Sequence, residues 1–237
     1  MAKETKSFSD MATCKICGEE VKVKQAKLHL KKCREKSPLP AGTKEAEIFL
    51  LRIRGMYLKG YVLVVEMSGN QTLEALDGFL RNIWLECCGH LSAFRINGLT
   101  YDCCPSEFSF PSEEEAGTFK AKLSDILSPG LNFSYEYDFG SSTDLELEVL
   151  DIRQTLEKPP TRPLLVMRNK PPHYECEVCG KPATVIVPQG YSADNRALFC
   201  SACAENENED EEREEEFYGM RLVNSPRTGV CGYDTET

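Results

Sequence analysis

The feature that most constrains this chain is a pair of Cys-x-x-Cys motifs in its last third. Cys176 and Cys179 form the first pair, Cys200 and Cys203 form the second, and twenty residues separate the two pairs. Each pair can supply two corners of a tetrahedron from one tight turn, which is typical of a structural zinc site with four thiolate ligands. Such a site leaves no open position for a substrate. The alternative is a pair of redox motifs or four unrelated structural cysteines.

A second metal pattern lies near the amino terminus. It begins with the pair Cys14 and Cys17. Eleven residues then separate Cys17 from His29, and three residues separate His29 from Cys33. This is the spacing of a two-cysteine, two-histidine finger with the last His replaced by Cys, and it resembles small Cys-Cys-His-Cys zinc fingers. On a helix, His29 and Cys33 would lie on one face and point at one ion. The alternative is that His29 is an ordinary helix residue.

Basic residues follow another face of the same predicted helix. These residues are Lys24, Lys27, Lys31 and Arg34. Lys and Arg neutralise phosphates and release counterions, so this face predicts a contact with nucleic acid. One finger buries little area, so we expect an accessory contact and not a specific reader. The alternative is a solvated lysine face.

The middle of the chain predicts one α+β domain with a mixed or antiparallel sheet and two helices. Asn97-Gly98 is a strong hairpin signal. Thr72 predicts the start of a helix that ends at Gly89, and a second helix is expected over residues 119–127. Strands are predicted at residues 48–53, 61–65, 94–96, 99–101, 132–137, 145–152 and 164–167, and those of the four-cysteine module at 184–187 and 197–199.

The remaining cysteines of the central domain allow a third metal site. Its candidate ligands are Cys87, Cys88, His90, Cys103 and Cys104. Neighbouring residues on a strand point to opposite faces, so simple packing of these cysteines is the alternative. The thiols, His90, Asp102 and Asp138 are also candidates for a nucleophilic enzyme site. Asp138 is equally suited to a turn at Gly140.

Several segments of the central domain carry a family resemblance. They are Thr72 to Leu76, His90 to Ile96, and above all the block Tyr135-Glu136-Tyr137-Asp138-Phe139-Gly140. From Ala46 to Ile152 the chain resembles the Ri-plasmid open-reading-frame-three-like family. The resemblance implies a compact, β-grasp-like domain found in bacterial, archaeal and mobile-element proteins, with no established activity. The family block continues with two acids and a Trp-Glu-His, where this chain has Ser141-Ser142-Thr143-Asp144-Leu145, which puts any site built on those residues in question.

Charge divides the chain into a basic front and an acidic back. The net charge is −10 over 237 residues, but residues 1–44 carry eleven Lys and Arg against five Asp and Glu. Glu205 to Glu216 holds nine acidic residues and only Arg213 as a base. This run predicts a solvated tether, and the alternative is that it covers the basic finger.

The patterns together predict a modular protein. Its parts are a Cys-Cys-His-Cys finger at 1–37, a linker at 38–44, the central domain at 45–170, a four-cysteine module at 171–204, the acidic tether at 205–216 and a last segment at 217–237. No apolar segment approaches the roughly 20 residues that cross a bilayer, and no secretory leader is visible. With twelve cysteines, several of them in metal spacing, we expect a cytoplasmic protein with reduced thiols and no membrane partner.

The predicted function is binding and not catalysis. We expect two zinc ions and a non-enzymatic module or adaptor for nucleic acid or protein; no catalytic residue and no small-molecule substrate can be assigned. The alternative is an enzyme of a mobile-element or nucleic-acid pathway with its site near Asp138 and His90. A pocket with converging polar groups would favour the enzyme.

Overall fold

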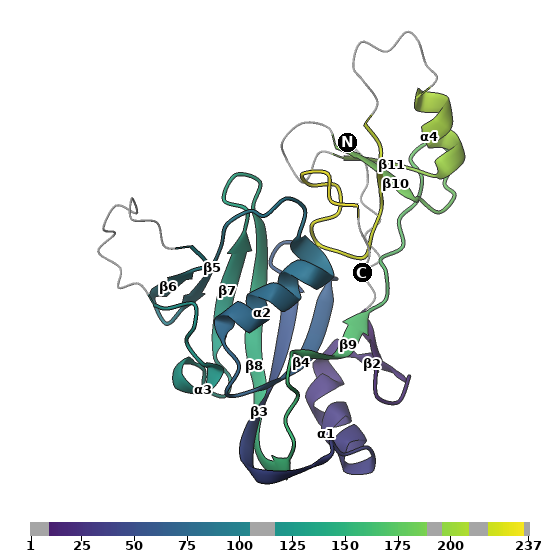
Figure 1. Ribbon diagram of the computed structural model, residues 1–237. Coiled ribbons are helices and arrows are strands. Elements are labelled where there is room, and N and C mark those ends of the chain that lie inside the picture. The colour runs from purple at the N-terminus through teal and green to yellow at the C-terminus, as the bar shows by residue number, and fades with distance from the viewer. Residues whose placement is uncertain (1–9, 105–116, 189–195, 209–217, 235–237) are drawn as a thin grey trace.

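The described chain forms one large and one small antiparallel sheet (Figure 1). The computed structural model describes residues 10–104, 117–188, 196–208 and 218–234. The large sheet has nine strands in the order β2-β1-β9-β4-β3-β8-β7-β5-β6. These strands are β1 Met11–Cys14, β2 Glu20–Lys22, β3 Ala41–Gly55, β4 Val62–Ser68, β5 Ser92–Ile96, β6 Leu99–Asp102, β7 Asn132–Tyr137, β8 Thr143–Glu157 and β9 Leu164–Asn169. The predicted α+β class is confirmed, and every strand predicted for the central domain is present.

Strands β3 and β8 form the spine of the large sheet. They pair antiparallel from Ala41 opposite Glu157 to Gly55 opposite Leu145. Side chains alternate between the two faces of a strand, so residues such as Leu51 enter the main core while Arg52 points to the other face. On that other face Arg52 pairs with Glu148 across the strands. The sheet therefore has one apolar face and one face that is charged over the middle strands.

A helix covers the apolar face. α2 Leu73–Leu80 continues into the π-helical turn η2 Arg81–Leu85, and its buried stripe includes Leu76, Leu80 and Trp84. The hydroxyl of Thr72 accepts a hydrogen bond from the backbone N–H of Ala75 at 3.3 Å, as expected for an N-cap. The predicted helix start is thus confirmed. A continuous core lies between this helix and the sheet.

The amino-terminal segment packs on the opposite face. The short turn η1 Val23–Gln25 leads into α1 Ala26–Lys36, whose buried Leu30 packs with Leu50 and Val64. Because Leu50 and Val64 alternate with core residues of β3 and β4, α1 and α2 lie on opposite sides of the sheet. Strand β1 also pairs with β9, so the large sheet includes strands from both the expected finger and the expected central domain.

The second predicted helix is shorter than expected. Only α3 Leu123–Ile126 is helical, whereas the pattern predicted 119–127. The carbonyl oxygens of Phe119 and Ala121 accept hydrogen bonds from the backbone N–H groups of Glu74 and Leu73. These N–H groups lie at the start of α2, where no partner within the helix exists. The residues before α3 therefore stay non-helical because their carbonyl groups bond the first turn of α2.

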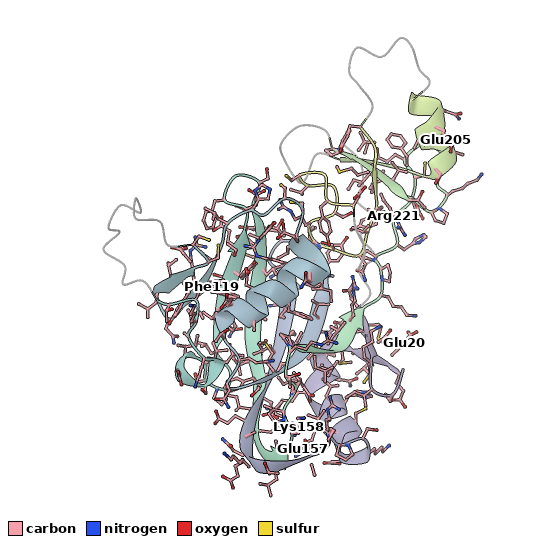
Figure 2. The ribbon with its side chains drawn as sticks, in the orientation of Figure 1. Glu20, Phe119, Glu157, Lys158, Glu205 and Arg221 are labelled. Carbon is pink, nitrogen blue, oxygen red and sulfur yellow. The ribbon has the colours of Figure 1, made fainter. Side chains whose placement is uncertain are left out.

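The small sheet belongs to the four-cysteine module. Its strands are β10 Val185–Pro188, β11 Arg196–Phe199 and β12 Met220–Arg221, and α4 Ser201–Asn208 follows β11. Their side chains, with Glu205 and Arg221 labelled, gather apart from the main core (Figure 2). The expected acidic tether begins inside α4, and its residues 209–216 lie outside the described part of the chain. Over the described residues, no helix is both long and apolar enough to span a bilayer.

The last described segment, 218–234, packs back onto the central domain. The indole Nε1 of Trp84 donates to the carbonyl oxygen of Asn224 at 3.0 Å. The hydroxyl of Ser225 donates to the carbonyl oxygen of Trp84 at 2.6 Å. The Arg227 side chain is fully buried. This segment is therefore part of the folded body.

The packing of α1 predicts a difference between two leucines of that helix. Leu30 is 2% exposed and Leu28 is 61% exposed. Leu30→Ala should lower the free energy of global unfolding by about 2–5 kcal/mol, because it opens a cavity between α1 and the sheet. Leu28→Ala should change it by no more than about 0.5 kcal/mol. Urea unfolding followed by Trp84 fluorescence measures both; equal effects would mean that α1 does not stabilise the sheet.

Candidate metal centres

Three clusters of Cys and His side chains bring metal-ligating atoms together. They are Cys14, Cys17, His29 and Cys33; Cys176, Cys179, Cys200 and Cys203; and Cys87, Cys88, His90 and Cys231. Within each cluster all four ligand atoms lie within 4.8 Å of one another. Each cluster therefore has the number and closeness of donors that a four-coordinate metal ion requires.

The amino-terminal cluster joins a turn to a helix. Cys14 ends β1, Cys17 lies in the turn before β2, and His29 and Cys33 lie one helical turn apart on α1. The Nε2 atom of His29 is 3.4 Å from the sulfur of Cys17 and 3.2 Å from that of Cys33. The other ring nitrogen of His29 lies 3.9 Å from a carboxylate oxygen of Glu19. All four predicted ligands thus meet at one point.

The carboxyl-terminal cluster joins two turns of the small module. Cys176 and Cys179 lie in the turn before β10, Cys200 follows β11, and Cys203 lies in the first turn of α4. The sulfurs of Cys179 and Cys200 are 3.6 Å apart. The four predicted thiols therefore converge, whereas His173, the other possible ligand nearby, is not a member of the cluster.

The third cluster differs from the predicted third set. Cys87, Cys88 and His90 do come together, but their fourth member is Cys231 from the last segment. Cys103 and Cys104 are not members. Instead the sulfur of Cys103 accepts a hydrogen bond from the backbone N–H of Ser92 at 3.3 Å, because β5 and β6 pair there.

A Cys-Gly dipeptide marks every cluster and could have revealed Cys231. The four such dipeptides in the chain begin at Cys17, Cys88, Cys179 and Cys231. The four glycines that follow have φ angles of +70° to +78°, a backbone conformation that L side chains rarely adopt. In the two Cys-x-x-Cys-Gly turns, the backbone N–H of Gly18 donates to the carbonyl oxygen of Cys14 and that of Gly180 donates to the carbonyl oxygen of Cys176, both at 2.9 Å.

Crowding of thiols keeps one sulfur of each cluster protonated. Burial and neighbouring thiols raise the pKa of Cys33 to about 12. The hydrogen bond to Cys179 contributes most to raising the pKa of Cys203 to about 12, and the hydrogen bond to Cys87 does the same for Cys88. A divalent cation offsets the repulsion between thiolates, so metal binding would release these protons.

The basic residues predicted to contact nucleic acid divide into two groups. Arg34 donates from Nε to both carboxylate oxygens of the buried Glu66 at 3.1 Å, and the Lys27 ammonium lies 3.0 Å from Asp151. Lys24 and Lys31 are exposed. Two of the four cations therefore form ion pairs within the chain, and the pair of Arg34 with Glu66 joins α1 to β4.

Comparison with known proteins gives a family and a distant structural neighbour. The family model described as plasmid pRiA4b ORF-3-like protein matches residues 64–192, which is more than half of the chain. A protein of unknown function from Methanosarcina mazei Go1, MM3350, has a crystal structure with a TM-score of 0.42 and 16% identity. The match covers 57% of this chain and 75% of that one. No curated protein matches the sequence.

The carboxyl-terminal cluster predicts a selective loss of metal. Cys179→Ser should remove one bound ion per chain, because an exposed thiolate is lost from a four-ligand site that folding of the small module needs. His173→Ala should leave the metal content unchanged. Elemental analysis of the two purified full-length variants measures this; equal metal content would contradict the assignment of Cys179.

Proposed function

This chain belongs to the plasmid pRiA4b ORF-3-like protein family, and we propose that it is a non-enzymatic binding module whose two ends are each held by a structural zinc ion. The observation that carries the proposal is that each terminal cluster is a complete set of four soft donors. Four protein ligands close a tetrahedral site, whereas a catalytic zinc keeps one position for water or substrate. Thiolate and imidazole donors favour zinc over the hard ions magnesium and calcium.

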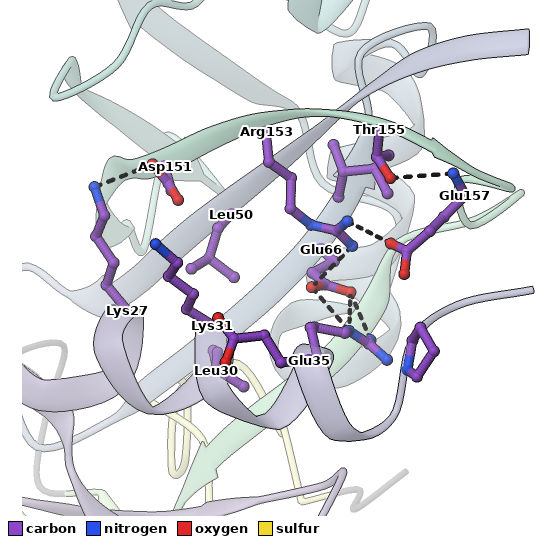
Figure 3. Close-up of a pocket in the computed structure, with 13 residues that line it drawn as sticks. Lys27, Leu30, Lys31, Glu35, Leu50, Glu66, Asp151, Arg153, Thr155 and Glu157 are labelled. Atoms are coloured by element: carbon purple, nitrogen blue, oxygen red, sulfur yellow. Dashed lines mark hydrogen bonds and ion pairs between the residues drawn. The ribbon is translucent and has the colours of Figure 1, made fainter.

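A groove between α1 and the sheet is the proposed binding surface. Its volume is about 510 Å³, within the range of roughly 300–1,000 Å³ that ligand pockets occupy. Leu30, Ile48 and Leu50 line it together with charged side chains from α1, β4 and β8 (Figure 3). The amino-terminal cluster holds the turn before β2 against α1, so zinc would fix one wall of this groove.

The charges of the groove favour a protein segment over nucleic acid. The lining includes four cations, Lys27, Lys31, Arg34 and Arg153, and four anions, Glu35, Glu66, Asp151 and Glu157. Most of them pair with one another, as Arg34 does with Glu66, and the dashed lines in Figure 3 mark the pairs of Lys27 with Asp151 and Arg153 with Glu157. Phosphate binding needs an excess of cations, whereas mixed charges suit the polar rim of a protein interface. Leu30, Ile48 and Leu50 lie beneath these charges, because they are only 2%, 1% and 8% exposed.

An enzyme of a nucleic-acid pathway is the second candidate. One observation favours it: the sulfur of Cys88 lies 2.9 Å from Nε2 of His90, whose Nδ1 lies 3.4 Å from Asp138. A thiol, a base and an orienting carboxylate are the parts of a nucleophilic site. However, the sulfur of Cys231 lies 3.3 Å from the same Nε2 atom. Two sulfurs converging on one nitrogen suit shared metal ligation better than a single activated nucleophile.

The groove predicts different effects for two neighbouring lysines of α1. Lys31 lines the groove and Lys32 does not, although both are exposed. Lys31→Glu should abolish capture of a protein partner by the full-length, zinc-loaded chain, because it reverses a charge at the rim. Lys32→Glu, with the same change of net charge, should retain it. Affinity capture from lysate of the source cells, with partners identified by mass spectrometry, measures this.

The same proteins should be titrated with labelled DNA and RNA at low and physiological salt. We expect weak binding that salt removes and that both variants reduce equally. Retention of the same protein partners by both variants would exclude the groove as the binding surface. Tight nucleic-acid binding at physiological salt would instead support the nucleic-acid interpretation.

A further inference from the structure

We infer that Cys87, Cys88, His90 and Cys231 form a third zinc site, which attaches the last segment of the chain to the central domain. The two terminal zinc sites do not require it. Cys88 and Cys231 are separated by 143 residues in the sequence, and their sulfurs lie 3.8 Å apart. The site depends on the docking of segment 218–234, because that segment supplies one of the four ligands, Cys231, and the other three come from residues 87–90.

The distances between the donor atoms fit a tetrahedral ion. With Zn–S bonds of about 2.3 Å and Zn–N bonds of about 2.0–2.1 Å, tetrahedral geometry separates two sulfurs by roughly 3.8 Å and a sulfur from a nitrogen by roughly 3.5 Å. The sulfur of Cys88 is 3.7 Å from that of Cys87 and 3.8 Å from that of Cys231, and Nε2 of His90 lies 3.3 Å from the sulfur of Cys231. The Cys88 sulfur is closer to Nε2 of His90, at 2.9 Å, so a bound ion would move these two atoms apart. The two predicted clusters show similar separations, such as 3.6 Å between Cys179 and Cys200.

A carboxylate orients the imidazole of this cluster. Nε2 of His90 faces the sulfurs, while Nδ1 lies 3.4 Å from a carboxylate oxygen of Asp138. Metal-ligating His residues commonly donate their other N–H to a carboxylate, which fixes the ring and its tautomer. In the amino-terminal cluster the carboxylate of Glu19 lies farther from Nδ1 of His29, at 3.9 Å, which is beyond hydrogen-bonding distance. Asp138 is therefore a positioning residue for His90.

A buried arginine links the cluster to the fold. Arg227 is fully buried and donates from Nη2 to Asp138 at 2.7 Å and to the sulfur of Cys87 at 3.4 Å. Its Nη1 donates to the hydroxyl of Thr143 at 3.0 Å. Arg227 comes from the same segment as Cys231, so one docking event supplies both a ligand and the partner of the positioning carboxylate. The guanidinium also offsets part of the negative charge of three thiolates.

The site explains how the chain end stays in place. The segment is bonded to Trp84 through Asn224 and Ser225, and the residues beyond them reach Cys231 through a turn at Gly229, which has a positive φ. A metal bond to Cys231 closes this segment at its far end. Zinc then fixes the segment that carries Arg227 and β12, which in turn pairs with β10 of the four-cysteine module.

The test compares metal content in matched full-length variants purified with zinc and a reductant. Wild type should hold three ions per chain, Cys231→Ser two, and Cys104→Ser three, since Cys104 is equally exposed and lies outside the cluster. His90→Cys should retain three ions because a thiolate can replace the imidazole as ligand, whereas His90→Ala should hold two. Hydrogen exchange of residues 218–234 should be faster in Cys231→Ser than in Cys104→Ser.

A measurement on the wild type alone covers the case in which a variant fails to fold. In the zinc-loaded protein, Cys88 and Cys231 should resist alkylation by iodoacetamide until a chelator is added, although both are exposed, while Cys104 should react at once. Two ions per wild-type chain, or Cys231 reacting as fast as Cys104 before chelation, would overturn the inference. Faster alkylation of Cys88 than of Cys104 in the same protein would overturn it in favour of a thiol nucleophile.

Discussion

The convergence of Cys and His side chains from separate segments is the constraint that recurs across this fold, and it matters most where the chain buries little apolar surface. The main core includes more than twenty buried side chains of the central sheet and α2. The buried apolar group of the four-cysteine module is much smaller, and two of its members, Cys176 and Cys200, are themselves ligands. A module of this size gains little stability from apolar burial alone, so a metal ion held by its four cysteines would contribute part of its folding free energy.

The amino-terminal cluster stabilises more than its own segment. Cys33 lies on α1 beside Leu30, and its partner Cys14 ends the strand that pairs with β9. A metal ion at this cluster would therefore hold α1 from one direction, while packing on the sheet holds it from another. Arg34 adds a third contact through the buried Glu66, whose carboxylate also lies 3.7 Å from Arg153. The groove along α1 is consequently bordered by rigid elements, and a rigid surface loses little conformational entropy when it binds a partner.

Local patterns predicted much of this structure from the sequence. The strands lie where apolar and polar residues alternate and where β-branched residues are frequent. The Asn97-Gly98 turn joins β5 to β6, and both of its residues have a positive φ. The eight ligands of the terminal clusters follow from spacing within each segment. What could not be predicted depends on contacts between distant segments: α3 is short because Phe119 and Ala121 bond the start of α2, and α1 meets the far face of β3 and β4. The one ligand missed, Cys231, reaches its partners only through the docking of a separate segment.

Charge patterning shows the same limit. Along the sequence the face of α1 is basic, because the count includes only residues on the helix. In the fold, Glu66 from β4 and Asp151 from β8 face Arg34 and Lys27, so the cations have partners that lie far away in the chain. An electrostatic footprint for nucleic acid needs cations without such partners. Lys27 and Arg34 therefore dock on acidic residues of the sheet, whereas Lys24, Lys31 and Lys32 are exposed, so the nucleic-acid contact stays a prediction that depends on these exposed lysines.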